Sequence, residues 1–158
     1  MSGFPGLRRA GLAPLALLLL AAASARLEAA PPATHYWPGE QVAASFARGG
    51  VLIETEGYKL HTSRRVEPGQ IEVHTMDTDI IHVLEGSATF VTGGTLKDGR
   101  EIAPEEIRGT QLEGGATQIL RQGDVIIVPN GTPHWFKAIE GPVLYYTVKV
   151  RAGNEVKR

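Results

Sequence analysis

The stretch Gly123-Asp-Val-Ile-Ile-Val-Pro-Asn-Gly-Thr-Pro-His134 contains a short apolar run, a turn and the beginning of a second run. Residues 124–128 are rich in Val and Ile, which pack well on the pleated surface of a sheet. Asn130-Gly131 is a turn signal, and residues 133–138 follow it as a further candidate strand. This segment therefore predicts two strands joined by a turn.

The chain from Val51 onward is divided in the same way, into short apolar runs separated by turn signals. The candidate strands are 51–54, 58–65, 70–75, 79–84, 87–92, 108–112, 116–120, 124–128, 133–138 and 143–150. So many short strands avoid exposed edges only by closing into a barrel or a two-sheet jelly roll. Residues 97–107 are expected to form a surface loop, and residues 41–48, before Gly49-Gly50, one short helix. The predicted fold is all-β with one short N-terminal helix.

The composition excludes several kinds of site. The 158 residues include no cysteine, which rules out disulfides, thiolate metal ligands and a cysteine nucleophile. The formal net charge is −1, so the chain has no basic surface suited to a phosphate backbone, and we expect no nucleic-acid partner. Any metal ion must therefore be bound by nitrogen and oxygen atoms.

The first 25 residues have the features of a signal peptide. Arg8 and Arg9 precede an apolar run too short to span a bilayer, and Ala23-Ser24-Ala25 matches a small-x-small cleavage site. We expect cleavage after Ala25, a periplasmic or secreted product and no membrane span after cleavage. An uncleaved anchor or a buried helix is the alternative, and the export route stays open. The predicted organisation is a signal peptide (1–25), a tether with the short helix (26–50), the barrel domain (51–152) and a C-terminal tail (153–158).

Acidic and histidine side chains converge on one predicted interior. Strand side chains alternate between faces, so Glu72 and His74 project the same way from one strand. On the next strand Asp79 shares a face with the apolar residues Ile81 and Val83, which indicates that this face is buried. A buried carboxylate without a partner is costly, and a cation held together with Glu72 and His74 is one candidate partner.

At these residues the chain resembles the cupin superfamily. The stretch 123–134 matches its second motif, Gly, five residues, Pro-x-Gly, two residues, His. Its first motif is commonly His-x-His, four residues, Glu, six residues, Gly; here the same spacing is filled by Glu72, His74, Asp79 and Gly86. The resemblance covers roughly residues 66–150 and implies a double-stranded β-barrel whose interior metal ion is bound by residues of both motifs.

Carried over residue by residue, the resemblance gives Glu72, His74, Asp79 and His134 as metal ligands. Two imidazoles and two carboxylates suit a divalent ion such as Mn²⁺, Fe²⁺, Ni²⁺ or Zn²⁺. If only three bind, two histidines and one carboxylate leave coordination positions open. The alternative is a barrel without an ion, in which Glu72 pairs with Arg64 or Arg65 and the two histidines are hydrogen-bonded core groups.

Five further residues are candidates for a substrate pocket: Arg64, Arg65, Phe136, Tyr145 and Tyr146. Phe136 shares its side of the strand with His134 and should face the interior. Arg64 and Arg65 alternate, so one of them should point inward, where a guanidinium can clamp a carboxylate or phosphate or pair with Glu72.

Four charged or titratable residues are expected outside the site. His82 lies on the opposite side of its strand from Asp79 and should pack away from the interior. His35 and His61 are expected on the surface or the tether. Arg108 is interpreted as a solvated loop charge, with closure of the pocket mouth as the alternative.

The leading functional hypothesis is an exported, metal-dependent cupin enzyme that acts on a small polar molecule. Oxygenase, isomerase and lyase chemistry all occur on this fold, so neither the reaction class nor a catalytic residue follows from the sequence. The competing hypothesis is a non-catalytic module that binds a small ligand without metal. A structural unit that pairs as a homodimer is a third possibility.

Overall fold

The computed structural model describes Met1 and residues 33–153. The predicted signal peptide beyond Met1, most of the predicted tether and residues 154–158 lie outside the described residues, so the expectations for these segments stay predictions. The fold described below belongs to the unit that begins at Tyr36. Within the described part of the chain, no helix combines the length and apolar character needed to cross a membrane.

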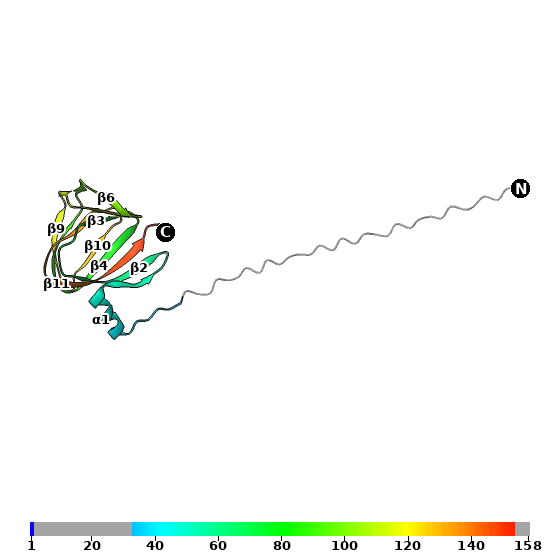
Figure 1. Ribbon diagram of the computed structural model, residues 1–158, viewed down its shortest axis with the longest axis horizontal. Coiled ribbons are helices and arrows are strands. Elements are labelled where there is room, and N and C mark those ends of the chain that lie inside the picture. Colours follow the sequence, from blue (N-terminus) through cyan, green and yellow to red (C-terminus); the bar gives the residue numbers. More distant parts are fainter. Residues whose placement is uncertain (2–32, 154–158) are drawn as a thin grey trace. The chain divides into compact units, whose positions relative to one another are not determined.

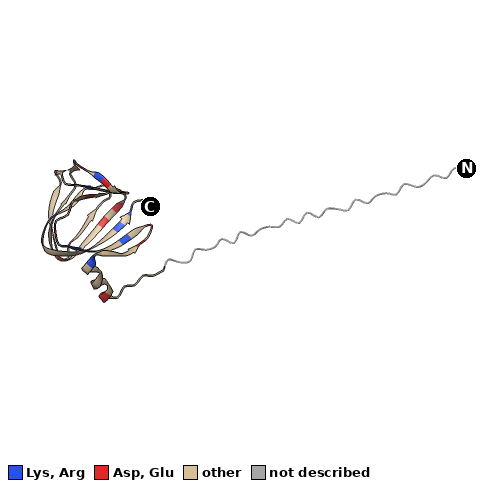
Figure 2. Ribbon diagram, viewed as in Figure 1, with Lys and Arg blue, Asp and Glu red and all other residues tan. Residues whose placement is uncertain are grey.

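The short N-terminal helix is present as α1 (Gly39–Arg48), two residues longer at its start than predicted. Glu40 lies in its first turn and Arg48 in its last, which is the arrangement that favours the helix dipole. Figure 2 shows an acidic (red) and a basic (blue) segment at opposite ends of the helix. Phe46 is the buried residue of α1, and its ring packs edge-on against Tyr146 with the ring centroids 5.2 Å apart. This contact attaches the helix to the outer surface of the sheet.

The rest of the unit is built from antiparallel strands, shown in Figure 1. Their bounds are β1 Gly50–Glu54, β2 Tyr58–Arg65, β3 Ile71–His74, β4 Asp77–Thr92, β5 Thr95–Leu96, β6 Arg100–Ala103, β7 Glu106–Gly109, β8 Leu112–Glu113, β9 Ala116–Arg121, β10 Val125–Val128 and β11 His134–Arg151. One sheet runs in the order β1-β2-β11-β3-β7-β6, with β4 joined to β11, β9 and β10, while β5 and β8 form a small separate ribbon. Figure 1 shows the large sheet curled on itself, so the all-β barrel prediction is confirmed.

Two breaks between candidate strands are bends inside longer strands. The candidate strands 79–84 and 87–92 are one strand, β4, and the candidates 133–138 and 143–150 are joined in β11. The two long strands pair along their whole length, with a register shift between Glu140 and Leu144 opposite the bend at Gly86. A β-bulge turns a strand without ending it, which is why the breaks in the apolar pattern at these positions did not mark strand ends.

The prediction of a surface loop over residues 97–107 is wrong. This segment contains β6 and the start of β7, and β7 pairs with β3 so that Arg108 lies opposite Glu72 and Glu106 opposite His74. β6 and the start of β7 were missed because their charged side chains break the apolar alternation by which half-buried strands are recognised. Because β7 lies next to β3, its charged residues Glu106 and Arg108 line the interior.

The apolar core fills one part of the barrel interior, and the polar side chains that face inward lie together in the other part. Phe90, Ile81, Val83 and Val143 are at most 2% exposed and belong to a single cluster. Asp79 precedes Ile81 and Val83 on the same face of β4, as predicted, and is 3% exposed. The same inner face of β4 therefore packs in the apolar core at Ile81 and Val83 and borders a polar cavity at Asp79.

Candidate metal centre and ligand cavity

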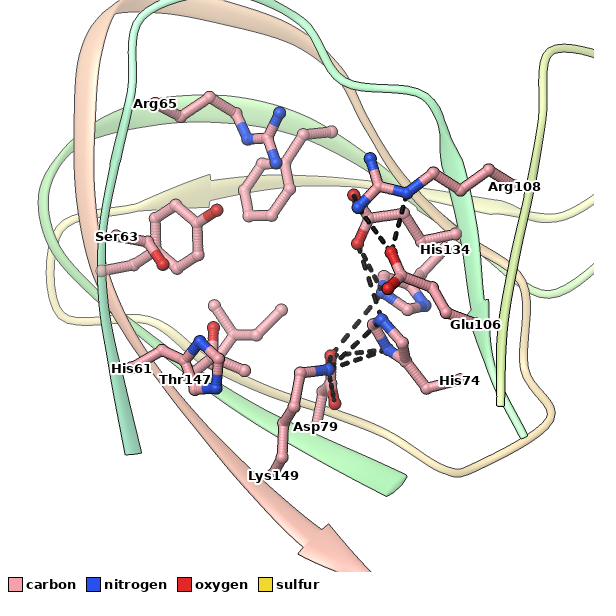
Figure 3. A pocket seen from close by; sticks show the side chains of 14 residues that line it. His61, Ser63, Arg65, His74, Asp79, Glu106, Arg108, His134, Thr147 and Lys149 are labelled. Atoms are coloured by element: carbon pink, nitrogen blue, oxygen red, sulfur yellow. Dashed lines mark hydrogen bonds and ion pairs between the residues drawn. The ribbon is translucent and has the colours of Figure 1, made fainter. Parts of the chain in front are cut away.

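A cavity of about 290 Å³ lies at the polar end of the curled sheet. Its lining residues come from β2, β3, β4, β7 and β11, and Figure 3 shows their side chains. They are His61, Ser63, Arg65, Glu72, His74, Asp79, Ile81, Glu106, Arg108, His134, Phe136, Tyr145, Thr147 and Lys149. Most of these side chains can donate or accept hydrogen bonds, so the cavity is suited to a small polar ligand.

Three metal-ligating side chains meet in this cavity. Glu72, His74 and His134 each offer one ligand atom, and these atoms all lie within 4.8 Å of one another. Glu72 and His74 occupy alternate positions of β3, and Glu72 lies directly opposite His134 of β11. Glu72 Oε2 is 3.8 Å from His74 Nε2 and 3.9 Å from His134 Nε2. Two neighbouring strands thus supply a carboxylate and two imidazoles.

His134 is held with one ring nitrogen directed at the cavity. Its Nδ1 lies 3.1 Å from the carbonyl oxygen of Thr132, which assigns the proton to Nδ1 and leaves the lone pair on Nε2. The residue is 4% exposed, and burial lowers the pKa of His134 below its usual value. A buried, neutral imidazole with a free Nε2 is the form that binds a metal ion.

Asp79 stands outside the three-residue group because other side chains occupy its oxygens. Lys149 Nζ donates to Oδ1 at 2.8 Å and to Oδ2 at 3.0 Å, and His74 Nδ1 is 3.1 Å from Oδ2. Burial alone would raise the pKa of Asp79, but the hydrogen bond from His74 and the charge of Lys149 outweigh burial and lower it. Asp79 is therefore a paired carboxylate that orients His74.

The partner of Glu72 is also different from the sequence expectation. Arg108 Nη2 lies 3.4 Å from Glu72 Oε1 and 2.6 Å from Glu106 Oε1, whereas neither Arg64 nor Arg65 is paired with Glu72. The interpretation of Arg108 as a solvated loop charge is wrong, since β7 carries it into the cavity wall. The ion pair uses Oε1 and leaves Oε2 facing the two histidines.

The five predicted pocket residues divide into two sets. Arg65, Phe136 and Tyr145 line the cavity, and the Phe136 and Tyr145 rings stack with centroids 4.9 Å apart. Arg64 and Tyr146, also expected in the pocket, lie outside it: Arg64 borders a neighbouring hollow, and Tyr146 contacts Phe46 of α1. The alternation of β2 and β11 turns each of these two residues to the opposite face.

A model of the family described as Cupin matches residues 63–157, which is more than half of the chain. The chain belongs to the cupin family. The matched segment contains both parts of the three-residue group, from β3 and from β11.

The chain was also compared with solved structures. The cupin resembles a protein from Bacillus halodurans with a TM-score of 0.52 and 14% identity, over 73% of this chain and 79% of the other. It is also similar to a protein from Neisseria meningitidis (TM-score 0.48, 13% identity, 73% and 99% of the two chains) and to a cupin protein from Bacteroides fragilis (0.43, 14%, 66% and 74%). A comparison with curated protein sequences found no match.

The donor set of this cupin fits a divalent metal ion. Bonds of about 2.1 Å in a tetrahedral site place neighbouring ligand atoms about 3.4 Å apart, and an octahedral site brings them closer. The distances of 3.8 and 3.9 Å from Glu72 Oε2 to the two histidine nitrogens need only small side-chain shifts to reach that value. His134 also has the hydrogen-bonded second nitrogen that is typical of histidine ligands.

Besides Arg108, the sequence interpretation missed or misplaced five residues of the cavity: His61, Ser63, Glu106, Thr147 and Lys149. Tyr145 was expected inside, and residues two and four positions later on the same strand, Thr147 and Lys149, therefore share its face. His61 was expected on the surface or the tether, but it lies opposite Thr147 and lines the cavity. His82, by contrast, is exposed on the outer face, as predicted.

Proposed function

We propose that this cupin binds a divalent metal ion through Glu72, His74 and His134 and is an enzyme that acts on a small polar molecule. The observation that carries the proposal is the convergence of these three donors within 4.8 Å at the wall of a cavity. Two histidines and one carboxylate leave coordination positions open for a ligand. The metal is one of Mn²⁺, Fe²⁺, Ni²⁺ and Zn²⁺, the ions that this mixed donor set suits.

The surrounding residues support this role by fixing the donors. The carbonyl of Thr132 and the carboxylate of Asp79 lie at the Nδ1 atoms of His134 and His74, so we assign the protons to Nδ1 in both rings. Nε2 of His134 is then free to bind metal, and Nε2 of His74, which has the ammonium of Lys149 3.3 Å away, becomes free once that ammonium moves aside. Arg108 holds the other oxygen of Glu72. Such outer partners orient metal ligands and raise their affinity for the ion.

Once bound, the ion would supply Lewis-acid chemistry to a ligand atom at the open positions. The protein's own residues bind and orient that ligand between β2 and β3. Because Asp79 has a lowered pKa, it stays a carboxylate at neutral pH and can accept a proton but has none to donate. The reaction is of oxygenase, isomerase or lyase type, the classes that the family resemblance implies.

A second candidate function is the binding of a small ligand without a metal ion. One observation favours it: the ammonium of Lys149 already lies 3.0 Å from His74 Nδ1 and 3.3 Å from His74 Nε2, and it pairs with Asp79. A resident cation can satisfy this part of the cavity in place of a metal ion. The two candidates therefore differ in whether the three donors retain an ion.

The metal content of the purified protein separates the two candidates. We expect close to one ion per chain in the wild type, measured by elemental analysis after expression without added metal, and loss of the ion in His74→Ala and His134→Ala. His82→Ala is the matched control, because His82 lies on the outer face of the same barrel. A wild-type protein without stoichiometric metal, together with unchanged metal content in the two variants, would contradict the metal-dependent function.

We also propose that the protein is exported to the periplasm or secreted. The proposal is supported by the order of features in residues 1–25: two arginines, a short apolar run and a small-x-small site. Mass spectrometry of the native N-terminus tests it, with Arg26 expected as the first residue. An intact N-terminus in the cytoplasmic fraction would contradict export.

A further inference from the structure

The wall of the cavity opposite the three metal-ligating donors carries a second set of polar groups. His61, Ser63 and Arg65 occupy alternate positions of β2, and all three line the cavity. Figure 3 shows these three residues on one side of the cavity and His74 and His134 on the other. A ligand in the cavity therefore meets two distinct polar surfaces.

Two atoms on the β2 wall are buried without a hydrogen-bond partner. They are Nε2 of His61 and Nε of Arg65. Buried polar atoms in native proteins are almost always paired, because an unpaired one forfeits the hydrogen bonds it had in water. Their position on a cavity wall indicates that a bound ligand supplies the missing partners.

The guanidinium of Arg65 is held in place rather than free to rotate. Its carbon lies 4.7 Å from the centre of the Phe136 ring, and a Cβ built on Gly69 would come within 2.6 Å of Nη1. Gly69 is itself fixed by backbone hydrogen bonding to Phe136 and by the indole of Trp135, which donates to its carbonyl oxygen at 2.7 Å. A planar guanidinium fixed in this way is prepared for an anion with two oxygens.

The charges around the cavity point to the same kind of ligand. Glu72 and Glu106 pair with Arg108, and Asp79 pairs with Lys149. Among the residues that the structure describes, Arg65 forms no ion pair with an acidic side chain. A divalent ion on the opposite wall would add further positive charge. The cavity therefore favours a ligand with negative charge near Arg65.

We propose that the β2 wall is an anion subsite in which Arg65, Ser63 and His61 bind the carboxylate of a small organic acid. The stacked rings of Phe136 and Tyr145, together with Ile81, provide an apolar surface for the body of the acid. The volume of about 290 Å³ limits it to a small molecule. That the far end of the acid reaches Glu72, His74 and His134 rests on the proposed function, whereas the carboxylate subsite itself does not.

Thermal stabilisation of the full-length protein by simple acids tests the subsite. Acetate, malonate, succinate and benzoate are compared with acetamide, malonamide, succinamide and benzamide and with inorganic phosphate, all at constant ionic strength. We expect at least one of the acids to raise the melting temperature in a saturable manner and the corresponding amide to have at most one tenth of its affinity. If none of the four acids does so, the proposal is overturned; if phosphate alone binds, the carboxylate assignment is overturned.

Variants on β2 identify the residues responsible. Arg65→Gln should lose acid binding, and Arg65→Lys, which keeps the charge without the fork of donors, should weaken it about ten-fold. Arg64→Gln is the matched control, since Arg64 is the neighbouring arginine but faces away from this cavity. Acid binding that survives Arg65→Gln with its affinity unchanged would overturn the proposal. Circular dichroism verifies the fold of each variant, and the Arg65→Lys result keeps the test decisive if Arg65→Gln does not fold.

The same samples distinguish this proposal from the metal site. His74→Ala should lose metal but keep Arg65-dependent binding of the acid, because the two residues lie on opposite walls (Figure 3). A wild-type protein that binds the acid through Arg65 but retains no metal would contradict the proposed function and leave the carboxylate subsite supported. Loss of acid binding in Arg65→Gln with metal content unchanged would support both.

Discussion

Asp79 and Lys149 form a 2.8 Å ion pair from directly opposed positions of β4 and β11. The ammonium occupies the place next to a buried carboxylate at which the sequence predicts a metal ion. It thereby satisfies Asp79 and leaves Glu72, His74 and His134 as the grouped donors. The pair decides how many carboxylates are available for a metal ion.

Replacing Lys149 by methionine should make the stability of the protein dependent on metal. Asp79 would become a buried carboxylate without its ammonium partner, which costs about 3 kcal/mol of unfolding free energy. Mn²⁺ or Zn²⁺ should recover much of this loss in Lys149→Met, with a gain in metal affinity of about ten-fold over wild type because Asp79 becomes a possible fourth ligand. Urea unfolding with and without the ion measures both effects.

Lys59→Met is the control for this substitution. Lys59 lies opposite Lys149 on β2 but pairs with the exposed Glu54. Its replacement should change stability little and leave metal affinity unaltered. Equal metal responses of wild type and Lys149→Met would show that the lysine does not restrict the ligand set.

Asp79→Asn should have the opposite effect on metal binding. An amide oxygen accepts the proton of His74 Nδ1 more weakly than a carboxylate does, so the orientation of this ligand is less well fixed. We expect affinity for Zn²⁺ or Mn²⁺ to fall about ten-fold, measured by calorimetric titration. Asp124→Asn, which removes an exposed carboxylate at the backbone of Arg121, should leave the affinity unchanged. An affinity equal to wild type would assign Asp79 a purely structural role.

Asp98 should make stability sensitive to acid. Hydrogen bonds from the Thr110 hydroxyl and from the backbone of Gln111 and Thr110 lower the pKa of Asp98 to about 2. Because the folded pKa lies below the unfolded value, the stabilisation is complete above about pH 4 and is lost as pH falls toward 2. Asp98→Asn should therefore be less stable than wild type at pH 6, with the difference shrinking by pH 2. Unfolding at several pH values measures the difference, and a constant difference would contradict the argument.

Gly86→Ala should destabilise the bend shared by the two long strands. Gly86 has φ +84°, and an added Cβ would lie 2.3 Å from the carbonyl oxygen of Pro142, which is backbone and cannot rotate away. We expect a loss of about 3 kcal/mol in unfolding free energy. Gly50→Ala, with no atom within 4 Å of the added Cβ, should change it by less than about 0.5 kcal/mol. Similar effects of the two substitutions would contradict a special role for the bend.

The sequence was sufficient to predict the barrel and much of the interior. The alternation of Glu72 with His74 and of Asp79 with Ile81 gave the correct faces because both strands carry apolar neighbours that identify the buried side. Arg108 was misassigned because a strand made of charged residues has no such reference. Lys149 was missed although its spacing from Tyr145 places it inside, since a lysine carries no signal of burial on its own. Partners across strands, such as Glu72 with Arg108, depend on register, which the sequence leaves open.

The bulge of β11 between Glu140 and Leu144 separates two functional halves of one strand. His134 lies before it, and Tyr145 and Lys149 lie after it, all facing the same cavity. Because strand side chains alternate, deleting a single residue at this bulge would exchange the inner and outer sides of everything downstream. Leu144 and Tyr146 would then turn inward and Lys149 outward. The length of this irregular segment therefore controls whether this part of the interior is polar or apolar.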